Sequence, residues 1–118
     1  MIIKYKNKKI NIDAEKVSEI GKISGLMFKT RQTKNLLFEF GKETRIKIHS
    51  FFVFFKFLAV WLNDKNKVIE WKMIKPFSIG YSPKKHFSKL IELPLNGKNR
   101  KTIQFLVGKK HASSFPRR

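Results

Sequence analysis

The sequence predicts a mainly β (α+β) domain with one or two short helices, and three observations support that prediction. Short runs rich in Phe, Val, Ile and Trp recur along the chain, which is typical of strands. Turn-forming Asn, Asp, Gly and Pro separate these runs. The length of 118 residues suits one domain, and 42% hydrophobic residues are enough for a core. We therefore expect a compact fold with mixed or antiparallel strands, barrel-like or sandwich-like, followed by a basic C-terminal tail.

The N-terminal quarter of the chain is predicted to form a hairpin followed by a helix. Residues 2–12 alternate between apolar and polar side chains on both sides of a central Asn-Lys pair, which predicts two short paired strands. Ile3 and Tyr5 would share one face of this hairpin. Residues 13–28 carry apolar residues at near-helical spacing after Asp13, a plausible N-cap. A short helix is expected there.

The rest of the chain is predicted to alternate between strands and turns. The expected strands are 35–40, 46–62, 67–74, 88–95 and 103–107. The expected loops and turns are 29–34, 41–45, 63–66, 75–87 and 96–102. The stretch 46–62 is too short and too charged for a membrane-spanning helix, which needs about 20 apolar residues. Because one strand of that length would also be unusual, we expect two strands with a bend near Phe55 and Lys56.

Charge is the strongest compositional signal in this chain. Lys and Arg number 27 against 8 acidic residues, which gives a net charge of +19. This excess repels itself, and a partner with dense negative charge would relieve the repulsion. Nucleic acid is the first expectation, an anionic membrane surface the second, and an indifferent solvated surface the third. Residues 1–107 are expected to form the single domain and 108–118 the tail, which would order only when something binds it.

The residue inventory argues against an enzyme. There is no cysteine, which excludes disulfides, thiolate zinc sites and cysteine nucleophiles. His49, His86 and His111 are scattered, and no pair has the spacing of a metal site. No acid pair suited to catalysis and no Gly-rich phosphate loop is present, so no cofactor and no metal are expected. Three glutamates are expected on strands, where lysines would pair with them across the sheet: Glu39, Glu70 and Glu92.

Several segments stand in a specific order along the chain. They are GLMF (25–28), NLLFEF (35–40), IHSFFVFFKFLAVWLNDKNKVIE (48–70), KPF (75–77) and YSPKKHFSKLIELPLNG (81–97). This series resembles the archaeal members of the DUF 192 domain family over about residues 10–97. The resemblance implies a mainly β domain with one or two short helices, and it implies no established biochemical activity.

The chain also departs from the pattern of that family. Leu58 stands where the family usually carries an aspartate, and Lys56 stands where proline or an acid is usual. Gly108 is followed by Lys109, where the family tends to have a Gly-Asp pair. If those acids serve a small-molecule or metal site, the resemblance implies that this chain has lost it. The departures make the surface more basic.

The basic residues are the candidate functional residues, because they gather in turns and at the ends of the chain. His86, with lysine neighbours, could contact phosphate or a base as a neutral ring. The candidate RNA-binding residues are Lys4, Lys6, Lys8, Lys9, Lys29, Arg31, Lys34, Arg45, Lys84, Lys85, His86, Lys89, Lys98, Arg100, Lys101, Lys109, Lys110, Arg117 and Arg118.

RNA is the expected partner. No helix-turn-helix, zinc finger or basic zipper is visible, and the Phe-rich stretch 51–57 is typical of a core rather than of base stacking. Recognition of folded RNA by shape and backbone fits better. The prediction is a cytoplasmic, archaeal-type ribosomal or ribosome-associated protein on ribosomal RNA, with neighbouring ribosomal proteins as further partners and without membrane or small-molecule substrate. The alternatives are a DNA-binding chromatin-type protein and a small-molecule-binding module of unknown ligand.

Overall fold

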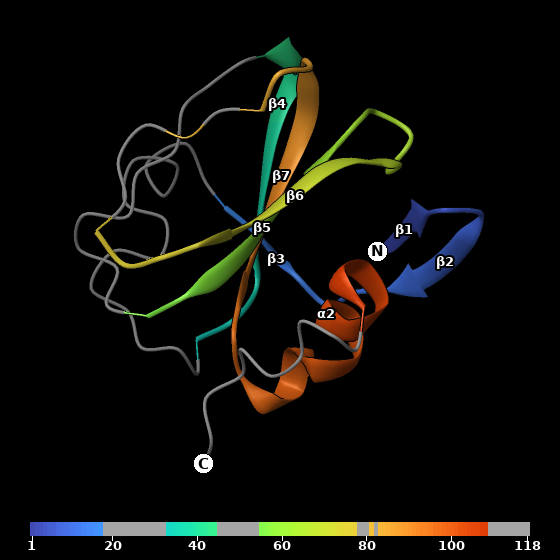
Figure 1. The fold of residues 1–118 in the computed structure, drawn as a ribbon. Coiled ribbons are helices and arrows are strands. Elements are labelled where there is room, and N and C mark those ends of the chain that lie inside the picture. Colours follow the sequence, from blue (N-terminus) through green and yellow to red (C-terminus); the bar gives the residue numbers. More distant parts are fainter. Residues whose placement is uncertain (18–32, 45–54, 78–80, 82, 109–118) are drawn as a thin grey trace.

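Two β-sheets and a short helical segment make up the described part of the chain. The structure, a computed structural model, describes residues 1–17, 33–44, 55–77, 81 and 83–108. Figure 1 shows the arrangement of these elements. They are β1 (Ile2–Tyr5), β2 (Lys8–Asn11), β3 (Glu15–Lys16), β4 (Leu36–Thr44), β5 (Phe57–Leu62), β6 (Val68–Ile74), β7 (Phe87–Pro94), the 3-10 turn η1 (Gly97–Asn99) and α2 (Arg100–Val107). The predicted mainly β fold with few short helices is therefore confirmed.

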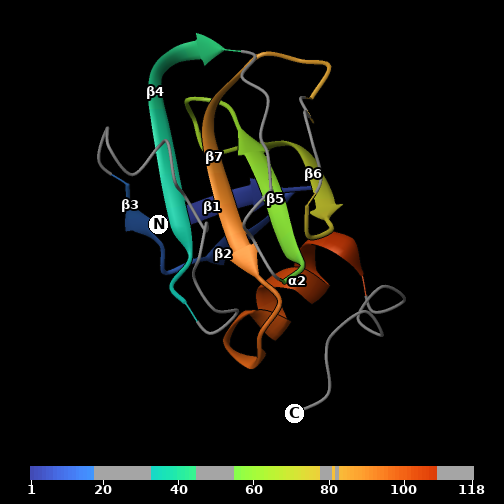
Figure 2. The same cartoon turned by 90° about the vertical axis from the view of Figure 1, so that its left-hand side faces the viewer.

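The larger sheet has five strands in the order β3-β4-β7-β5-β6. Figure 2 shows this sheet face-on, with the β1–β2 hairpin behind it. Strand β7 is antiparallel to both β4 and β5, and β5 is antiparallel to β6. Every residue of β5 is buried, and so is every residue of β7 except the half-buried Lys89. Such continuous apolar runs are expected where a strand is covered on both faces.

Two hydrophobic clusters occupy the two faces of this sheet. Alternation along β5 sends Leu58, Val60 and Leu62 into the first cluster and Phe57, Ala59 and Trp61 into the second. The hairpin and α2 cover the first cluster, to which they contribute Ile3, Ile12, Ile103, Leu106 and Val107. Figure 1 shows the hairpin and α2 together on that side of the sheet.

The N-terminal hairpin is confirmed. Strands β1 and β2 pair antiparallel, with Ile3 opposite Ile10. The two residues that connect the strands, Lys6 and Asn7, have φ values of 48° and 64°. A two-residue turn with positive φ at both positions matches the twist of the flanking strands. Ile3 is fully buried while Lys4 is exposed, as the alternation predicts.

The helix predicted from Asp13 is wrong over the residues that the structure describes. Residues 15 and 16 form β3, parallel to β4. The amide N–H of Glu15 donates to the carbonyl of Asn35 at 2.8 Å, and that of Val17 donates to Leu37 at 2.9 Å. The edge of β4, 20 residues further along the chain, thus provides the hydrogen bonds that a first helical turn would have made. The remainder of the prediction, 18–28, lies outside the described residues.

The strand predicted at 103–107 is also wrong, because these residues belong to α2. The predicted basic turn at 96–102 is helical as well: it contains η1 and the start of α2. The side chain of Asn96 accepts a hydrogen bond from the amide of Asn99 at 3.2 Å and caps η1. The helix buries one face at helical spacing. The residues buried on that face are Thr102, Ile103, Leu106 and Val107.

The other strand predictions hold over the described residues, and one turn prediction is wrong. Strands β6 and β7 coincide with the predictions at 67–74 and 88–95, and a turn joins β5 to β6 at 63–66. The predicted bend lies at Phe55, next to the exposed Lys56, whereas residues 46–54 lie outside the described part. The turn predicted at 41–45 is wrong over 41–44, since β4 continues to Thr44 through a register shift. Gly41 suits such an irregularity in a strand.

The three strand glutamates have different surroundings. Glu39 forms the expected ion pair, with Lys16 at 3.7 Å. Glu70 instead accepts a hydrogen bond from the hydroxyl of Tyr81. Burial, together with this bond and the charge of Glu70, raises the pKa of Tyr81 to about 12. Among the described residues, the partner of Glu70 is therefore Tyr81, where a lysine was expected.

Glu92 is buried in the second hydrophobic face. It lies opposite Leu36 on β4 and Ala59 on β5, and 7% of its surface is exposed. Within the described part of the chain, neither its Oε1 nor the Nε1 of Trp61 has a hydrogen-bond partner. Over the part of the chain that the structure describes, the lysine partner expected for Glu92 is not found. Loss of hydration raises the pKa of its carboxyl group to about 8.

Glu92→Gln is expected to change how stability depends on pH. The pKa of Glu92 rises from 4.5 in the unfolded chain to about 8 in the folded one. The contribution of Glu92 to the free energy of unfolding is therefore fully present below pH 4.5. It is lost as the pH rises toward 8, by about 1.4 kcal/mol per pH unit. Urea unfolding measured from pH 5 to 8.5 should show that the free energy of unfolding of the variant rises relative to that of the wild type as the pH increases. Parallel stability profiles for the two proteins would contradict this assignment.

Candidate nucleic-acid interface

The structure places the predicted basic residues at several separate locations. The hairpin carries Lys4, Lys6, Lys8 and Lys9, all exposed. Lys34 precedes β4 and forms an ion pair with Glu15 at 3.5 Å. Others lie just before or within β7 and in the helical segment: Lys84, Lys85, His86, Lys89, Lys98, Arg100 and Lys101. The predicted residues that lie outside the described part are Lys29, Arg31, Arg45, Lys109, Lys110, Arg117 and Arg118.

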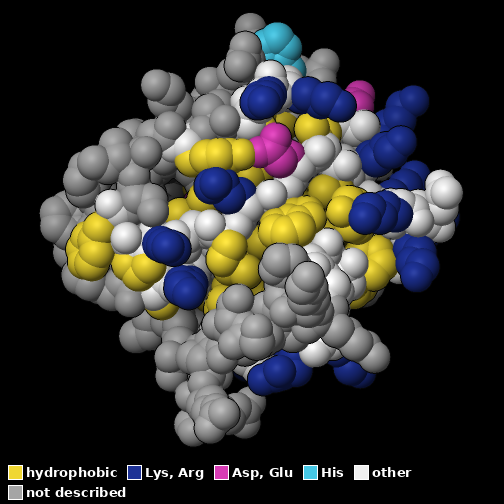
Figure 3. Space-filling model, in the orientation of Figure 1, with side chains coloured by type: hydrophobic (Ala, Val, Ile, Leu, Met, Phe, Trp, Pro, Cys, Tyr) yellow, Lys and Arg dark blue, Asp and Glu magenta, His cyan; other side chains and the backbone are white. Residues whose placement is uncertain are grey.

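The two tight hairpins, β1–β2 and β5–β6, lie side by side. The amide N–H of Lys4 donates to the carbonyl of Asn66 at 2.9 Å, and Lys4 and Lys67 form an isolated parallel bridge. The Nζ of Lys89 donates to the side-chain oxygen of Asn66 at 2.5 Å. Figure 3 shows Lys and Arg side chains gathered on the side of the molecule where these hairpins lie.

Three lysines stand in a row across this junction. Lys9 is directly opposite Lys4 in the hairpin, and Lys4 is bridged to Lys67. We call Lys9, Lys4 and Lys67 the lysine row. All three are exposed, and none of them has an acidic partner among the described residues. Neighbouring strands lie about 4.8 Å apart, so the row holds like charges close together.

The β5–β6 turn holds its part of the row in place through its own side chains. The Oδ1 of Asn63 accepts hydrogen bonds from the amides of Lys65 and Lys67, both at 2.9 Å. Asn66 has a φ of 64°, a conformation that asparagine tolerates. Sequence reasoning missed Lys65 and Lys67, because it treated residues 63–66 only as a turn and Lys67 only as the start of a strand. The signal available in the sequence was the alternation of these two lysines with the asparagines of the turn.

An aromatic pocket lies beside the hairpin. Its volume is about 250 Å³, and it is lined by Tyr5, Lys6, Lys8, Trp71, Phe105, Leu106, Val107 and Gly108. The rings of Tyr5 and Phe105 meet edge to face with centroids 6.2 Å apart. The indole N–H of Trp71 donates to the hydroxyl of Tyr5 at 3.4 Å. Sequence analysis did not bring these three aromatic residues together, since they lie on β1, β6 and α2.

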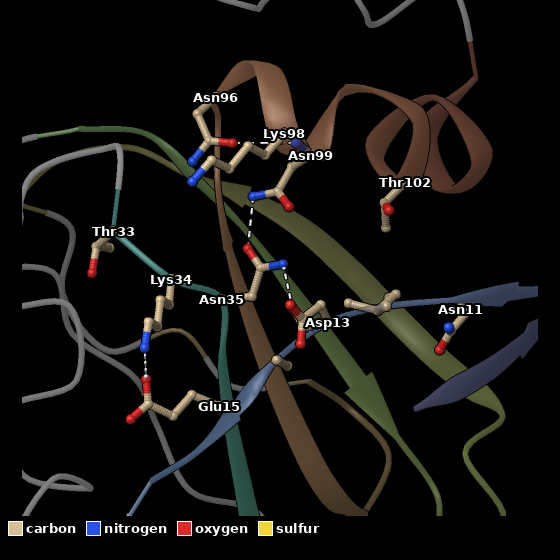
Figure 4. A pocket seen from close by; sticks show the side chains of 12 residues that line it. Asn11, Asp13, Glu15, Thr33, Lys34, Asn35, Asn96, Lys98, Asn99 and Thr102 are labelled. Carbon is tan, nitrogen blue, oxygen red and sulfur yellow. Dashed lines mark hydrogen bonds and ion pairs between the residues drawn. The ribbon is translucent and has the colours of Figure 1, made fainter.

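A larger pocket of about 530 Å³ lies where the N-terminal segment, β4 and η1 meet. Figure 4 shows the polar side chains that line it. The Nδ2 of Asn99 donates to Asn35 Oδ1 and to the carbonyl of Pro94, both at 2.7 Å. Asn35 Nδ2 in turn donates to the carbonyl of Asp13 at 2.8 Å. These bonds join β7, β4 and the N-terminal segment, so the amides stabilise the fold.

The described residues offer little for other kinds of site. They include no group of three or more His, Asp or Glu side chains that could hold a metal ion. Among them, no helix has both the length and the apolar character needed to cross a bilayer.

Comparison with known proteins identifies the fold. No family model matches the chain, so its resemblance to the DUF 192 family stays a prediction. No curated protein sequence matches it either. A "putative transcription regulator" from Sinorhizobium meliloti is similar in structure, with a TM-score of 0.69 and 16% identity over 86% of this chain and 81% of the other. A protein of unknown function from Novosphingobium aromaticivorans has a TM-score of 0.67 and 10% identity, over 85% and 74%. At these identities the likeness establishes the fold alone.

Asn99→Ala is expected to destabilise the protein by about 1–3 kcal/mol, because it removes two donors and leaves buried acceptors unpaired. Asn99 is 3% exposed. Lys98→Ala, at an exposed neighbour that lines the same pocket, should change stability by less than about 0.5 kcal/mol. Chemical denaturation of the two variants provides the measurement. Equal effects would show that the amide bonds do not hold this corner of the fold.

Proposed function

We propose that the protein binds RNA, as a ribosomal or ribosome-associated protein that docks on ribosomal RNA in the cytoplasm. The lysine row is the observation that supports this proposal best. Like charges placed directly opposite each other in a sheet are unfavourable, and the row joins three of them from two hairpins. Phosphate groups would remove that repulsion and release counterions from the RNA. The net charge of +19 means that the whole chain repels itself in the same way, and phosphate groups would reduce that repulsion too.

The geometry favours contacts with the nucleic-acid backbone. Helix α2 faces the first hydrophobic cluster through Ile103, Leu106 and Val107, so its apolar face is not available to a groove. Arg100 and Lys101, at its start, are exposed. Exposed lysines on hairpins and on a helix end suit recognition of folded RNA by its shape and phosphates.

DNA binding is the second candidate. The observation that favours it is the fold shared with the "putative transcription regulator" from Sinorhizobium meliloti. Competition between duplex DNA and structured RNA of equal charge separates the two possibilities. Preferential displacement by RNA supports the leading proposal, and preferential displacement by DNA supports the second candidate.

The double variant Lys4→Gln/Lys67→Gln is expected to weaken RNA binding and to reduce the slope of log K against log salt by about 2, one for each lost phosphate contact. The variant should be at least as stable as the wild type without RNA, since it removes repulsion. Filter binding between 50 and 200 mM salt gives the slope.

A matched control removes the same charge elsewhere on the sheet. Lys16 lies on β3, at the opposite edge from β6, and Lys56 precedes β5, at the other end of that strand from the lysine row. Lys16→Gln/Lys56→Gln should change the slope less than the row variant does. If both double variants lose affinity equally, net charge rather than the lysine row governs binding.

The ribosomal assignment has its own test. Cell extract from the source organism is run through a sucrose gradient at low salt, and the protein is located by mass spectrometry. The protein should migrate with ribosomal particles and leave them at high salt. A protein that stays at the top of the low-salt gradient, while ribosomes migrate below, is not ribosomal.

A further inference from the structure

We infer that the aromatic pocket of Tyr5, Trp71 and Phe105 binds one unpaired nucleobase of a single-stranded RNA segment, with Lys6 and Lys8 at the adjoining phosphates. The inference rests on the proposed function and deepens it. It adds a base contact to a surface that otherwise contacts only backbone. The pocket is already present in this structure.

The pocket has the size and lining for a flat ring. Its volume of about 250 Å³ falls below the range of about 300–1,000 Å³ for pockets that hold drug-sized ligands. Tyr5, Trp71 and Phe105 are each half-buried, so part of each ring remains accessible. Aromatic side chains of this kind stack with bases of any sequence, since every base has a π face.

The surrounding charge favours a nucleotide over an apolar ligand. The Nζ of Lys6 lies 5.2 Å from the centroid of the Tyr5 ring, and Lys8 is paired with Tyr5 across the hairpin. Two cations among the lining residues suit a base that carries phosphates on both sides. The described residues that line the pocket include no acid, so nothing there would repel a phosphate.

The packing of the aromatic rings favours the same conclusion. Tyr5, Trp71 and Phe105 pack against the first hydrophobic cluster and contact one another edge to face and through a hydrogen bond. Together they line the hollow between β1, β6 and α2. The rings hold one another in position before any ligand arrives.

The test compares two polyanions that differ in whether they carry bases. Single-stranded oligoadenylate and inorganic polyphosphate are titrated at low salt into the full chain and into Trp71→Leu. The variant should bind oligoadenylate about tenfold more weakly, the scale of one lost base stack, and should bind polyphosphate as the wild type does. Oligoadenylate, but not polyphosphate, should quench the fluorescence of Trp71, because Trp61 is fully buried.

Two further variants control for folding. Trp71→Phe keeps an aromatic face and should retain most of the oligoadenylate affinity. Phe77→Leu removes an aromatic side chain that is 54% exposed outside the pocket and should leave both affinities unchanged. An equal loss for oligoadenylate and polyphosphate in Trp71→Leu, or no loss for either, would overturn the inference.

The outcomes separate the inference from the proposed function. If neither polyanion binds the wild type, the proposed function fails. If both bind and Trp71→Leu changes neither, only the base pocket fails. Quenching by vesicles of anionic phospholipid without quenching by oligoadenylate would assign the pocket to a membrane surface and would overturn the inference.

Discussion

Strand β7 has a neighbour on each edge and an apolar layer on each face, and the rest of the described structure depends on that constraint. It pairs with β4 and β5, and its residues are buried apart from Lys89. A strand in this position needs an apolar sequence on both faces. Strand β5 beside it has the same character. Among the described residues, β5 therefore carries no cation and β7 carries only the half-buried Lys89.

That constraint makes Glu92 exceptional. The residue belongs to β7 and is paired with Leu36 and Ala59, which both belong to the second hydrophobic cluster. Its carboxyl group remains neutral until the pH approaches about 8. The protein thus holds an acid inside a molecule whose surface is strongly basic. The buried acid gives no relief to the surface lysines, because it carries little charge at neutral pH.

The sequence predicted local pairing well and distant pairing poorly. The β1–β2 hairpin and the β5–β6 turn follow from alternation and turn residues that stand next to each other in the chain. By contrast, β3 exists because β4 offers it hydrogen bonds, and no local pattern at Glu15 and Lys16 reports that. Residues 103–107 favour a strand by composition, but burial on one face makes them part of α2, which follows the 3-10 turn that Asn96 caps. The lysine row joins Lys4 to a residue more than 60 positions away, which periodicity cannot show.

The lysine row and the aromatic pocket belong to opposite faces of one ribbon. In β1, Lys4 points outward, while Tyr5 packs against the first cluster and lines the pocket. Successive residues of a strand point to opposite faces, so this alternation divides backbone contact from base contact. A bound RNA strand would pass from one face to the other at the turn formed by Lys6 and Asn7. Lys6 and Lys8 flank Asn7 at that turn. Two residues of turn therefore connect the two kinds of recognition that the proposal requires.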